Sequence, residues 1–324
     1  MLQQRGLTAL VVLLGLALIS LGQDKDQGKA KIEGTPLKWK FEKDKTFYQE
    51  MKTETKQTMK VMGSEVVQNQ DQTFYFSWTP IKVEGDTVTI RQKIEGVKMS
   101  IDIGGSKINY DSTAAQPASN PLSDFFKQLV GAEFTLTLDT KTMKVTKIEG
   151  RDKFVENLVK ANPQMKPLLE QILSEEALKE MADPTFAAIP AESVAKGQTW
   201  TRETKLNMGP IGTYENSYKY TYEGPDGKLQ KIKVDTTLKY VPPSETTPTG
   251  GLPFKIKSAD LQSKDASGTI LFDTEKGRVD KSEMNIKLEG KLSIEIGGQT
   301  TTVELSQTQK TTVTTSDTNP IKKS

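Results

Sequence analysis

The sequence predicts an α+β protein with extended, curved antiparallel sheets, half-barrel-like in shape, and amphipathic helices packed on one face. Three observations lead to this class: alternating apolar and polar residues over two long segments, turn residues between the alternating runs, and helical periodicity concentrated near the centre of the chain. Alternation with a period of two gives strands with one buried and one wet face, which is the antiparallel habit. A β-sandwich with a helical insertion is the alternative.

The first β-rich half is predicted over residues 37–150. Phe74, Phe76 and Trp78 fall on one face of a predicted strand, and Phe134–Leu138 alternates apolar residues with threonine. Glu84–Asp86 and Gly104–Gly105 provide turn signals between such strands. These segments predict a series of hairpins in this half of the chain.

Helical periodicity predicts helices in two places. Residues 120–130 follow an i, i+3, i+4, i+7 pattern, with Asn120 as the expected N-cap. Residues 151–190 form the predicted helical centre, in which Ser174 starts the third helix. Each helix is amphipathic and needs an apolar surface to cover. We therefore expect the helices of 120–130 and 154–181 to pack on the concave side of the sheet.

The second β-rich half is predicted over residues 191–315. It contains the tyrosine-rich segment Tyr214–Tyr222. Pro225–Gly227 predicts a tight turn, because proline presets φ and glycine takes a positive φ. Further short strands are expected at Phe254–Ile256, Gly268–Phe272, Met284–Leu288, Leu292–Ile296 and Val303–Leu305.

The first 22 residues have the features of an export signal. Arg5 supplies a positive charge, Leu7–Leu21 is almost wholly apolar, and small residues precede a cleavage after Gly22. An uncleaved N-terminal anchor is the alternative, and no later segment is long and apolar enough to span a membrane. We expect a flexible lead-in at residues 23–36, a disordered tail at 316–324, and a protein exported to the periplasm or extracellular space.

Composition excludes several chemistries. The chain has no His and no Cys, so it lacks the ligands of Cys/His zinc, iron–sulfur and blue-copper sites. Lys+Arg 44 and Asp+Glu 42 nearly balance, which argues against nucleic acid as a partner. We expect no cofactor and no resident metal. Because no histidine titrates, we also expect a stability that is nearly flat between about pH 5 and 8.

Candidate catalytic residues are few, and each has a structural alternative. Ser193 and Lys196 match the Ser-x-x-Lys of serine penicillin-binding enzymes, but the companion Ser-Asp-Asn and Lys-Thr-Gly segments do not occur. Asp139 and Asp273 each follow an apolar strand and are expected to cap turns, with a carboxylate pair for acid/base chemistry or for calcium as the alternative. We therefore expect a protein that is not an enzyme.

A ligand cavity is expected between the sheet and its helices. Met51, Met59, Met62 and Met99 suit an irregular apolar cavity, although core filling explains them as well. The residues expected to line this cavity come from the predicted helices: Phe125, Phe126, Leu129, Phe154, Leu158, Met165 and Leu169.

Several short segments carry a resemblance to a known group of proteins. Leu37–Phe41 is an opening strand with Trp and Phe, Glu54–Met59 is rich in threonine, and Lys196–Trp200 follows Ile189–Pro190. Together with the export signal, these segments resemble an uncharacterised secreted family of planctomycete bacteria, and the resemblance implies no activity. At the level of fold, a long antiparallel sheet with late helices also resembles the half-barrel of periplasmic lipoprotein carriers.

The sequence leaves three functions open. The first is a non-enzymatic binding or carrier protein of the periplasm or cell envelope, with an apolar small molecule or lipid in its cavity. The second is a structural or protein-interaction component of the envelope. The third is a hydrolase that uses carboxylates alone.

Overall fold

The structure is a computed structural model that describes residues 34–115, 123–190 and 192–322. The export signal, most of the lead-in and the expected cap Asn120 lie outside these residues. The described chain is mostly strand, with short helices between the two β-rich parts.

The elements follow the order β-rich part, helices, β-rich part. The first strands are β1 (Phe47–Val61), β2 (Ser64–Glu84), β3 (Thr87–Ile103), β4 (Ser106–Asp111), β5 (Glu133–Asp139) and β6 (Lys144–Glu149). The helices are α2 (Ser123–Leu129), α3 (Arg151–Ala161), α4 (Lys166–Ile172), α5 (Glu175–Ala182) and α6 (Pro184–Ala187), with 3-10 turns η1 (Pro163–Met165) and η2 (Gly209–Ile211). The later strands are β7 (Thr199–Asn207), β8 (Thr213–Asp226), β9 (Leu229–Val241), β10 (Lys255–Asp273), β11 (Arg278–Ile296) and β12 (Gln299–Ser316).

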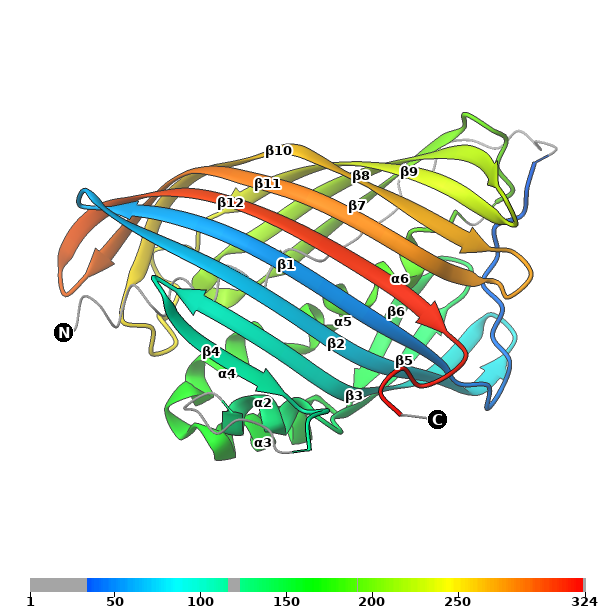
Figure 1. Ribbon diagram of the computed structural model, residues 1–324, viewed down its shortest axis with the longest axis horizontal. Coiled ribbons are helices and arrows are strands. Elements are labelled where there is room, and N and C mark those ends of the chain that lie inside the picture. Colours follow the sequence, from blue (N-terminus) through cyan, green and yellow to red (C-terminus); the bar gives the residue numbers. More distant parts are fainter. Residues whose placement is uncertain (1–33, 116–122, 191, 323–324) are drawn as a thin grey trace.

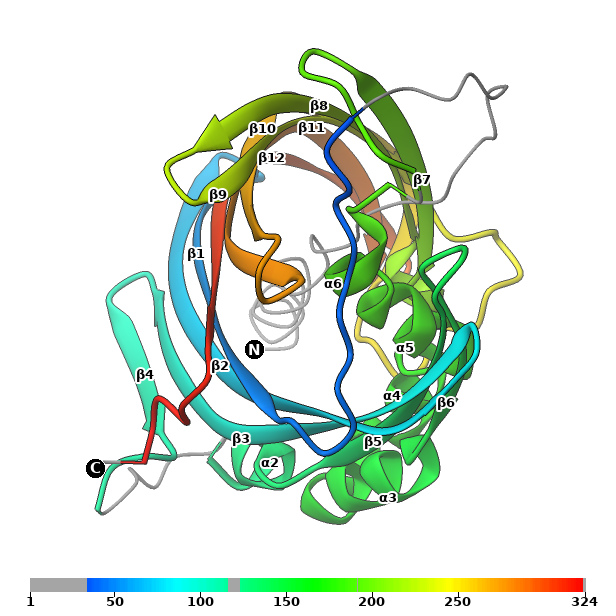
Figure 2. The same cartoon turned by 90° about the vertical axis from the view of Figure 1, so that its right-hand side faces the viewer.

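The strands that the structure describes form one antiparallel sheet. Its order is β6-β5-β3-β2-β1-β12-β11-β10-β9-β8-β7, and β4 pairs with the second part of β3. The pairing of β1 with β12 joins the first and last strands, so both β-rich parts share one surface. Figure 1 shows the long strands side by side, and Figure 2 shows the sheet curling into an open ring. The predicted curved antiparallel sheet is confirmed, and the sandwich alternative is wrong.

Local sequence explains the hairpins. Gly85, Gly105 and Gly227 all have positive φ and lie in the tight turns that the sequence predicts. Along β1, the odd-numbered residues from Phe47 to Val61 face the inside of the curl and are mostly buried, whereas the even-numbered ones face outwards. We refer to the concave side of the sheet as the inner face.

The strands of the second part are longer than the sequence predicts. The short strands expected at 254–256 and 268–272 belong to the single strand β10, and those at 284–288 and 292–296 both belong to β11. A β-bulge between Lys264 and Ser267 shifts the register of β10 against β11. A bulge breaks the two-residue period without ending the strand, and this explains the division of β10. In β11 the register against β12 is continuous, and Gly290 takes the inward position between Leu288 and Leu292, which interrupts the apolar alternation.

The helices pack beside strands near the open edges of the sheet, where α5 contacts β6 and β7 and α2 contacts β3. The ring of Phe154 on α3 meets the ring of Phe134 on β5 edge-on, with centroids 5.0 Å apart. Phe134 pairs in register with Gln92, which pairs with Trp78, so these side chains share the inner face. Ser174 caps α5 as predicted, because its hydroxyl accepts a hydrogen bond from the N–H of Ala177.

One end of the ring is crossed by the segment that precedes β1 (Figure 2). Thr35 pairs with Val194, and the N–H of Lys40 donates to the carbonyl of Gly277. Beneath this segment lies a group of touching rings that we call the aromatic cluster. Its members are Trp39, Phe41, Phe47, Trp78, Phe186 and Phe272.

Candidate functional site

A block of nine uncharged polar side chains lies at the centre of the inner face. Three adjacent strands, β2, β1 and β12, contribute three residues each, and the residues pair in register across the strands. We call this group the Gln/Thr block, and all of its side chains are buried. Its members are Gln68, Gln70 and Gln72 of β2, Thr53, Thr55 and Gln57 of β1, and Gln307, Gln309 and Thr311 of β12.

An apolar rim surrounds the Gln/Thr block on the inner face. It comes from the register partners on β3 and β11 and from the next inward-facing residues along β2, β1 and β12. The rim consists of Met99, Ile101, Ile103, Met284, Ile286, Leu288, Met51, Phe74, Val313, Met59, Val66 and Leu305. The polar groups are thus an island on an apolar surface.

Hydrogen bonds fix part of the Gln/Thr block. The Nε2 of Gln68 donates to Oε1 of Gln70 over 3.1 Å, and the Nε2 of Gln70 donates to Oε1 of Gln72 over 3.3 Å. The hydroxyls of Thr53 and Thr311 lie 3.3 Å apart across β1 and β12. These contacts set the orientation of the β2 amides and of one border of the block.

The rest of the block has unused hydrogen-bonding capacity. Gln57 and Gln307 are register partners, and neither side-chain amide has a hydrogen-bond partner among the described residues. The same holds for the hydroxyl of Thr55 and for Oε1 of Gln68 and Gln309. An unpaired buried polar group costs about 1–3 kcal/mol, so folded proteins keep few of them. Such a concentration on one surface indicates a place where a ligand or ordered water supplies the missing partners.

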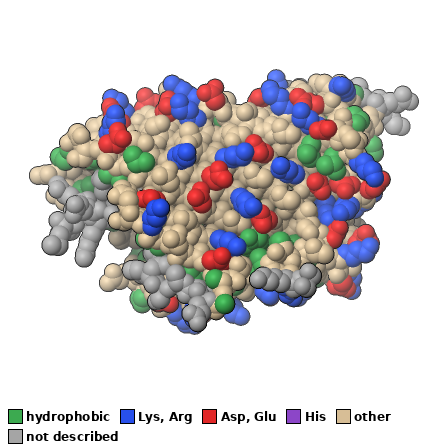
Figure 3. Space-filling model, viewed as in Figure 1, with side chains coloured by type: hydrophobic (Ala, Val, Ile, Leu, Met, Phe, Trp, Pro, Cys, Tyr) green, Lys and Arg blue, Asp and Glu red, His purple; other side chains and the backbone are tan. Residues whose placement is uncertain are grey.

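The outer face differs from the inner face in charge. Glu54 and Lys56, which alternate with the block residues of β1, are exposed. Figure 3 shows basic and acidic side chains interspersed over this outer face. Cross-strand ion pairs such as Lys310–Glu283, at 3.1 Å, belong to it. The charges lie outside, whereas neither the block nor its rim contains a charged residue.

The seven residues predicted to line a cavity lie in the hydrophobic core beside α2, α3 and α4. The structure brings them together, but they are not part of the Gln/Thr block, and their role as a cavity lining stays a prediction. Phe126, Leu129, Phe154, Leu158 and Leu169 are buried, and Phe125 and Met165 are partly buried against the same core.

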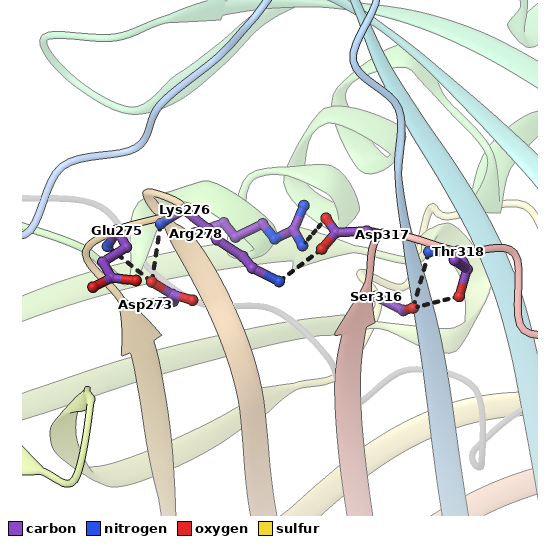
Figure 4. A network of polar contacts seen from close by, with 7 residues as sticks. All are labelled: Asp273, Glu275, Lys276, Arg278, Ser316, Asp317 and Thr318. Carbon is purple, nitrogen blue, oxygen red and sulfur yellow. Dashed lines mark hydrogen bonds and ion pairs between the residues drawn. The ribbon is translucent and has the colours of Figure 1, made fainter.

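The predicted turn-capping aspartates are confirmed. The carboxylate of Asp139 accepts hydrogen bonds from the N–H groups of Lys141 and Thr142 at 2.8 and 3.0 Å. These hydrogen bonds, with that from Thr142 the strongest, hold the pKa of Asp139 below its usual value. Asp273 caps the β10–β11 turn in the same way, accepting from the N–H groups of Glu275 and Lys276 (Figure 4).

The Ser-x-x-Lys match lies on an irregular segment between α6 and β7. Val194, between its serine and lysine, exchanges backbone hydrogen bonds with Thr35. A turn follows at Lys196–Gly197, so Ser193 does not begin a helix as the penicillin-binding arrangement requires. This segment anchors the chain that crosses the end of the ring.

One buried and one half-buried carboxylate at the seam of the sheet, Asp183 and Glu180, were not among the residues predicted from the sequence. α5 packs against both edge strands, β6 and β7, and lies between them in Figure 2. Asp183, directly after α5, accepts a hydrogen bond from the N–H of Val145 on β6. Glu180 is hydrogen-bonded by the backbone of Lys205 on β7. These contacts use edge-strand N–H groups that no neighbouring strand satisfies.

Burial raises the pKa of both carboxyl groups. Desolvation raises the pKa of Asp183 to about 6, and the hydrogen bond from Val145 only partly offsets this. Desolvation also raises the pKa of Glu180, which lies near Asp183 and adds to its shift. The sequence signal for this pair is a Glu-x-x-Asp spacing at the end of a short amphipathic helix.

Fold and site together define a class: an open, strongly curved antiparallel sheet with helices across its seam and an uncharged polar block on its inner face. The chain belongs to a family of unknown function, DUF6263, which matches residues 85–279. This agrees with the expectation of an uncharacterised β-rich family. Its export and its planctomycete origin stay predictions.

The solved structures that match this chain have low sequence identity and low TM-scores. Lipovitellin, from a study of its lipid–protein interactions, has 10% identity and a TM-score of 0.43, covering 88% of this chain and 27% of its own. This chain therefore spans about a quarter of lipovitellin. OccK5 of Pseudomonas aeruginosa has 6% identity and a TM-score of 0.19, covering 83% of this chain and 97% of its own. DynF of the dynemicin pathway of Micromonospora chersina has 9% identity and a TM-score of 0.19, covering 91% and 95%.

No curated protein matches the chain in sequence. None of the helices within the described ranges is long and apolar enough to cross a membrane. The same ranges contain no group of three or more acidic side chains placed to hold a metal ion.

Proposed function

We propose that the protein is an exported, non-enzymatic binding or carrier protein of the periplasm or cell envelope, which holds an apolar small molecule or lipid against the inner face of its sheet. The observation that carries this proposal is the Gln/Thr block within its apolar rim. Binding sites for small molecules are mostly apolar, with a few convergent polar groups that orient the ligand. The inner face has this composition, and its unpaired amides are the groups that a ligand would engage.

The hydrolase alternative gains no support from the acidic residues described above. Asp139 and Asp273 cap turns, and Asp183 and Glu180 bind the backbone of the two edge strands. A glycosidase-like mechanism needs one carboxylic acid and one carboxylate on either side of a substrate, about 5–10 Å apart. Each of these four groups serves a structural contact instead.

Native mass spectrometry of the exported chain tests the proposal. The protein is purified after secretion under its own N-terminal segment, weighed intact, and extracted with organic solvent. We expect a mass that begins at Gln23 and an apolar compound in the extract. The extracted protein should then take up a fluorescent apolar probe such as 1-aminoanthracene.

Two results together would overturn the proposal. The first is a mass with no bound compound, and the second is no uptake of the probe by the extracted, folded protein. A stable protein partner found by cross-linking, with neither ligand nor probe bound, would favour the envelope-interaction function instead.

A further inference from the structure

We propose that the Gln/Thr block recognises an uncharged polar head group, of the hydroxyl or amide type, on an amphiphile whose apolar chain lies on the surrounding rim. This inference rests on the proposed binding function and names the class of ligand for it.

The first argument is the kind of hydrogen-bonding capacity left unused. Gln57 and Gln307 each leave an amide donor and an amide acceptor free, and the two residues are register partners on the side of the block next to Met59 and Leu305. The hydroxyl of Thr55 and the Oε1 of Gln68 and Gln309 lie around them. A mixed set of neutral donors and acceptors complements hydroxyl and amide groups, which also both donate and accept.

The second argument is pre-organisation. Successive amides along β2 donate from Gln68 to Gln70 and from Gln70 to Gln72, so each amide is held by its neighbour. The Nε2 of Gln309 donates to the hydroxyl of Thr311, which leaves the Oε1 of Gln309 free. The free Oε1 atoms of Gln68 and Gln309 therefore belong to side chains that their neighbours already orient, beside the unpaired amides of Gln57 and Gln307. Binding through such groups loses less side-chain entropy than binding through mobile ones.

The third argument is the absence of compensating charge. Neither the block nor the apolar rim contains a Lys, Arg, Asp or Glu residue. A buried carboxylate or phosphate without a cation carries a large desolvation cost. The block is thus matched to a neutral head group and mismatched to a fatty-acid carboxylate or a phospholipid phosphate.

The test compares three ligands with the same oleoyl chain: monoolein, oleamide and oleate, each titrated at about pH 8.5, where oleate is ionised. Displacement of bound 1-aminoanthracene from the extracted full-length protein reports the affinities. We expect monoolein and oleamide to bind at least about tenfold more tightly than oleate, because only oleate brings an uncompensated charge.

Variants test whether the block causes this difference in affinity between the neutral ligands and oleate. The double variant Gln57→Leu with Gln307→Leu removes the two fully unpaired amides, and it should weaken monoolein binding by about tenfold or more while leaving oleate binding unchanged. Gln262→Leu is the matched control, because Gln262 is exposed on β10. The control should leave all three affinities unchanged.

Each outcome decides between the inference and the proposed function. If oleate binds as tightly as monoolein, or if the folded double variant keeps its affinity for monoolein, the inference is wrong and the binding function stands. If the wild type binds neither the probe nor any of the three ligands, both fail. Should the double variant not fold, Thr55→Val removes one hydroxyl with little change of shape, and it must weaken monoolein binding by about threefold for the inference to stand.

Discussion

The aromatic cluster and the Gln/Thr block lie on the same inner face, but they are built differently. In the cluster, Phe186 is fully buried and its ring lies 5.3 and 5.5 Å from the rings of Trp39 and Trp78. The indole N–H of Trp39 donates to the carbonyl of Phe186, whereas that of Trp78 has no partner among the described residues. In the block, the amides of Gln57 and Gln307 are buried without a partner.

This difference separates stability from function within one sheet. Packed rings contribute favourable burial at the end of the sheet, whereas unpaired amides at its centre oppose folding. Proteins keep such unfavourable groups where function requires them and offset their cost elsewhere. Substitutions in the cluster and in the block each change one side of this comparison, whereas those at the seam and beside the crossing segment test other supports of the sheet.

The largest effect is expected from Phe186→Ala in the aromatic cluster. The substitution leaves a cavity between Trp39 and Trp78, and we expect the free energy of unfolding to fall by about 3–5 kcal/mol. Urea unfolding measures this as a lower midpoint with an unchanged slope. Val83→Ala, at a residue that is 42% exposed, is the control and should change stability by less than about 0.5 kcal/mol. A loss below about 1 kcal/mol for Phe186→Ala would show that the cluster is not a main source of stability.

The next effect is a pH dependence from Asp183 at the seam. Because burial raises its pKa from 3.8 to about 6, the native state holds a proton that the unfolded state has lost between these pH values. Stability from this group is therefore fully present below about pH 4 and is lost as the pH rises through 6, by about 3 kcal/mol. This predicts a slope between about pH 4 and 6, where the missing histidines alone predict a nearly flat profile above about pH 5.

Asp183→Asn provides the comparison for that profile. The amide oxygen still accepts from Val145 but carries no charge, so the variant should be more stable than the wild type at pH 7 and equal to it near pH 4. Unfolding curves from pH 4 to 8 measure both proteins. If the free energy of unfolding falls with pH to the same extent in the wild type and in Asp183→Asn, the pH dependence comes from other groups.

A smaller effect of opposite sign is expected at an unpaired amide of the block. Gln57→Leu removes two unpaired buried atoms, so the ligand-free protein should become more stable by about 1–3 kcal/mol. Thermal unfolding of extracted protein measures this, with Gln262→Leu within about 0.5 kcal/mol of wild type. A clear destabilisation by Gln57→Leu would mean that this amide has structural partners, and the contrast with the aromatic cluster would disappear.

The smallest effect is expected at the ion pairs beside the crossing segment. Asp317 lies 2.7 Å from Lys276, also pairs with Arg278, and is 60% exposed (Figure 4). Solvent screens such a pair, so Asp317→Asn should lower stability by less than about 1 kcal/mol, and about 1 M NaCl should remove the difference. A larger, salt-independent loss would place this network among the main supports of that end of the sheet.

The block was missed in the sequence because both faces of its strands are polar there. From Lys52 to Thr58 every residue of β1 is polar, so no apolar alternation shows which side is buried. The segment Glu54–Met59 was noticed only as part of a family resemblance. The inward direction of Thr53, Thr55 and Gln57 follows from the apolar residues at the two ends of β1, such as Phe47 and Met59.

The sequence by itself determined the strands, their turns, the amphipathic helices and the uncharged, cysteine-free composition. These are local properties, set by side-chain period and by the φ that glycine and proline adopt. Only the tertiary structure decided that Thr53 meets Thr311, 258 residues away, and that α5 joins β6 to β7. The pairing of distant strands depends on the register of the whole sheet, which no local pattern encodes, and it alone assembles three polar strand segments into one site.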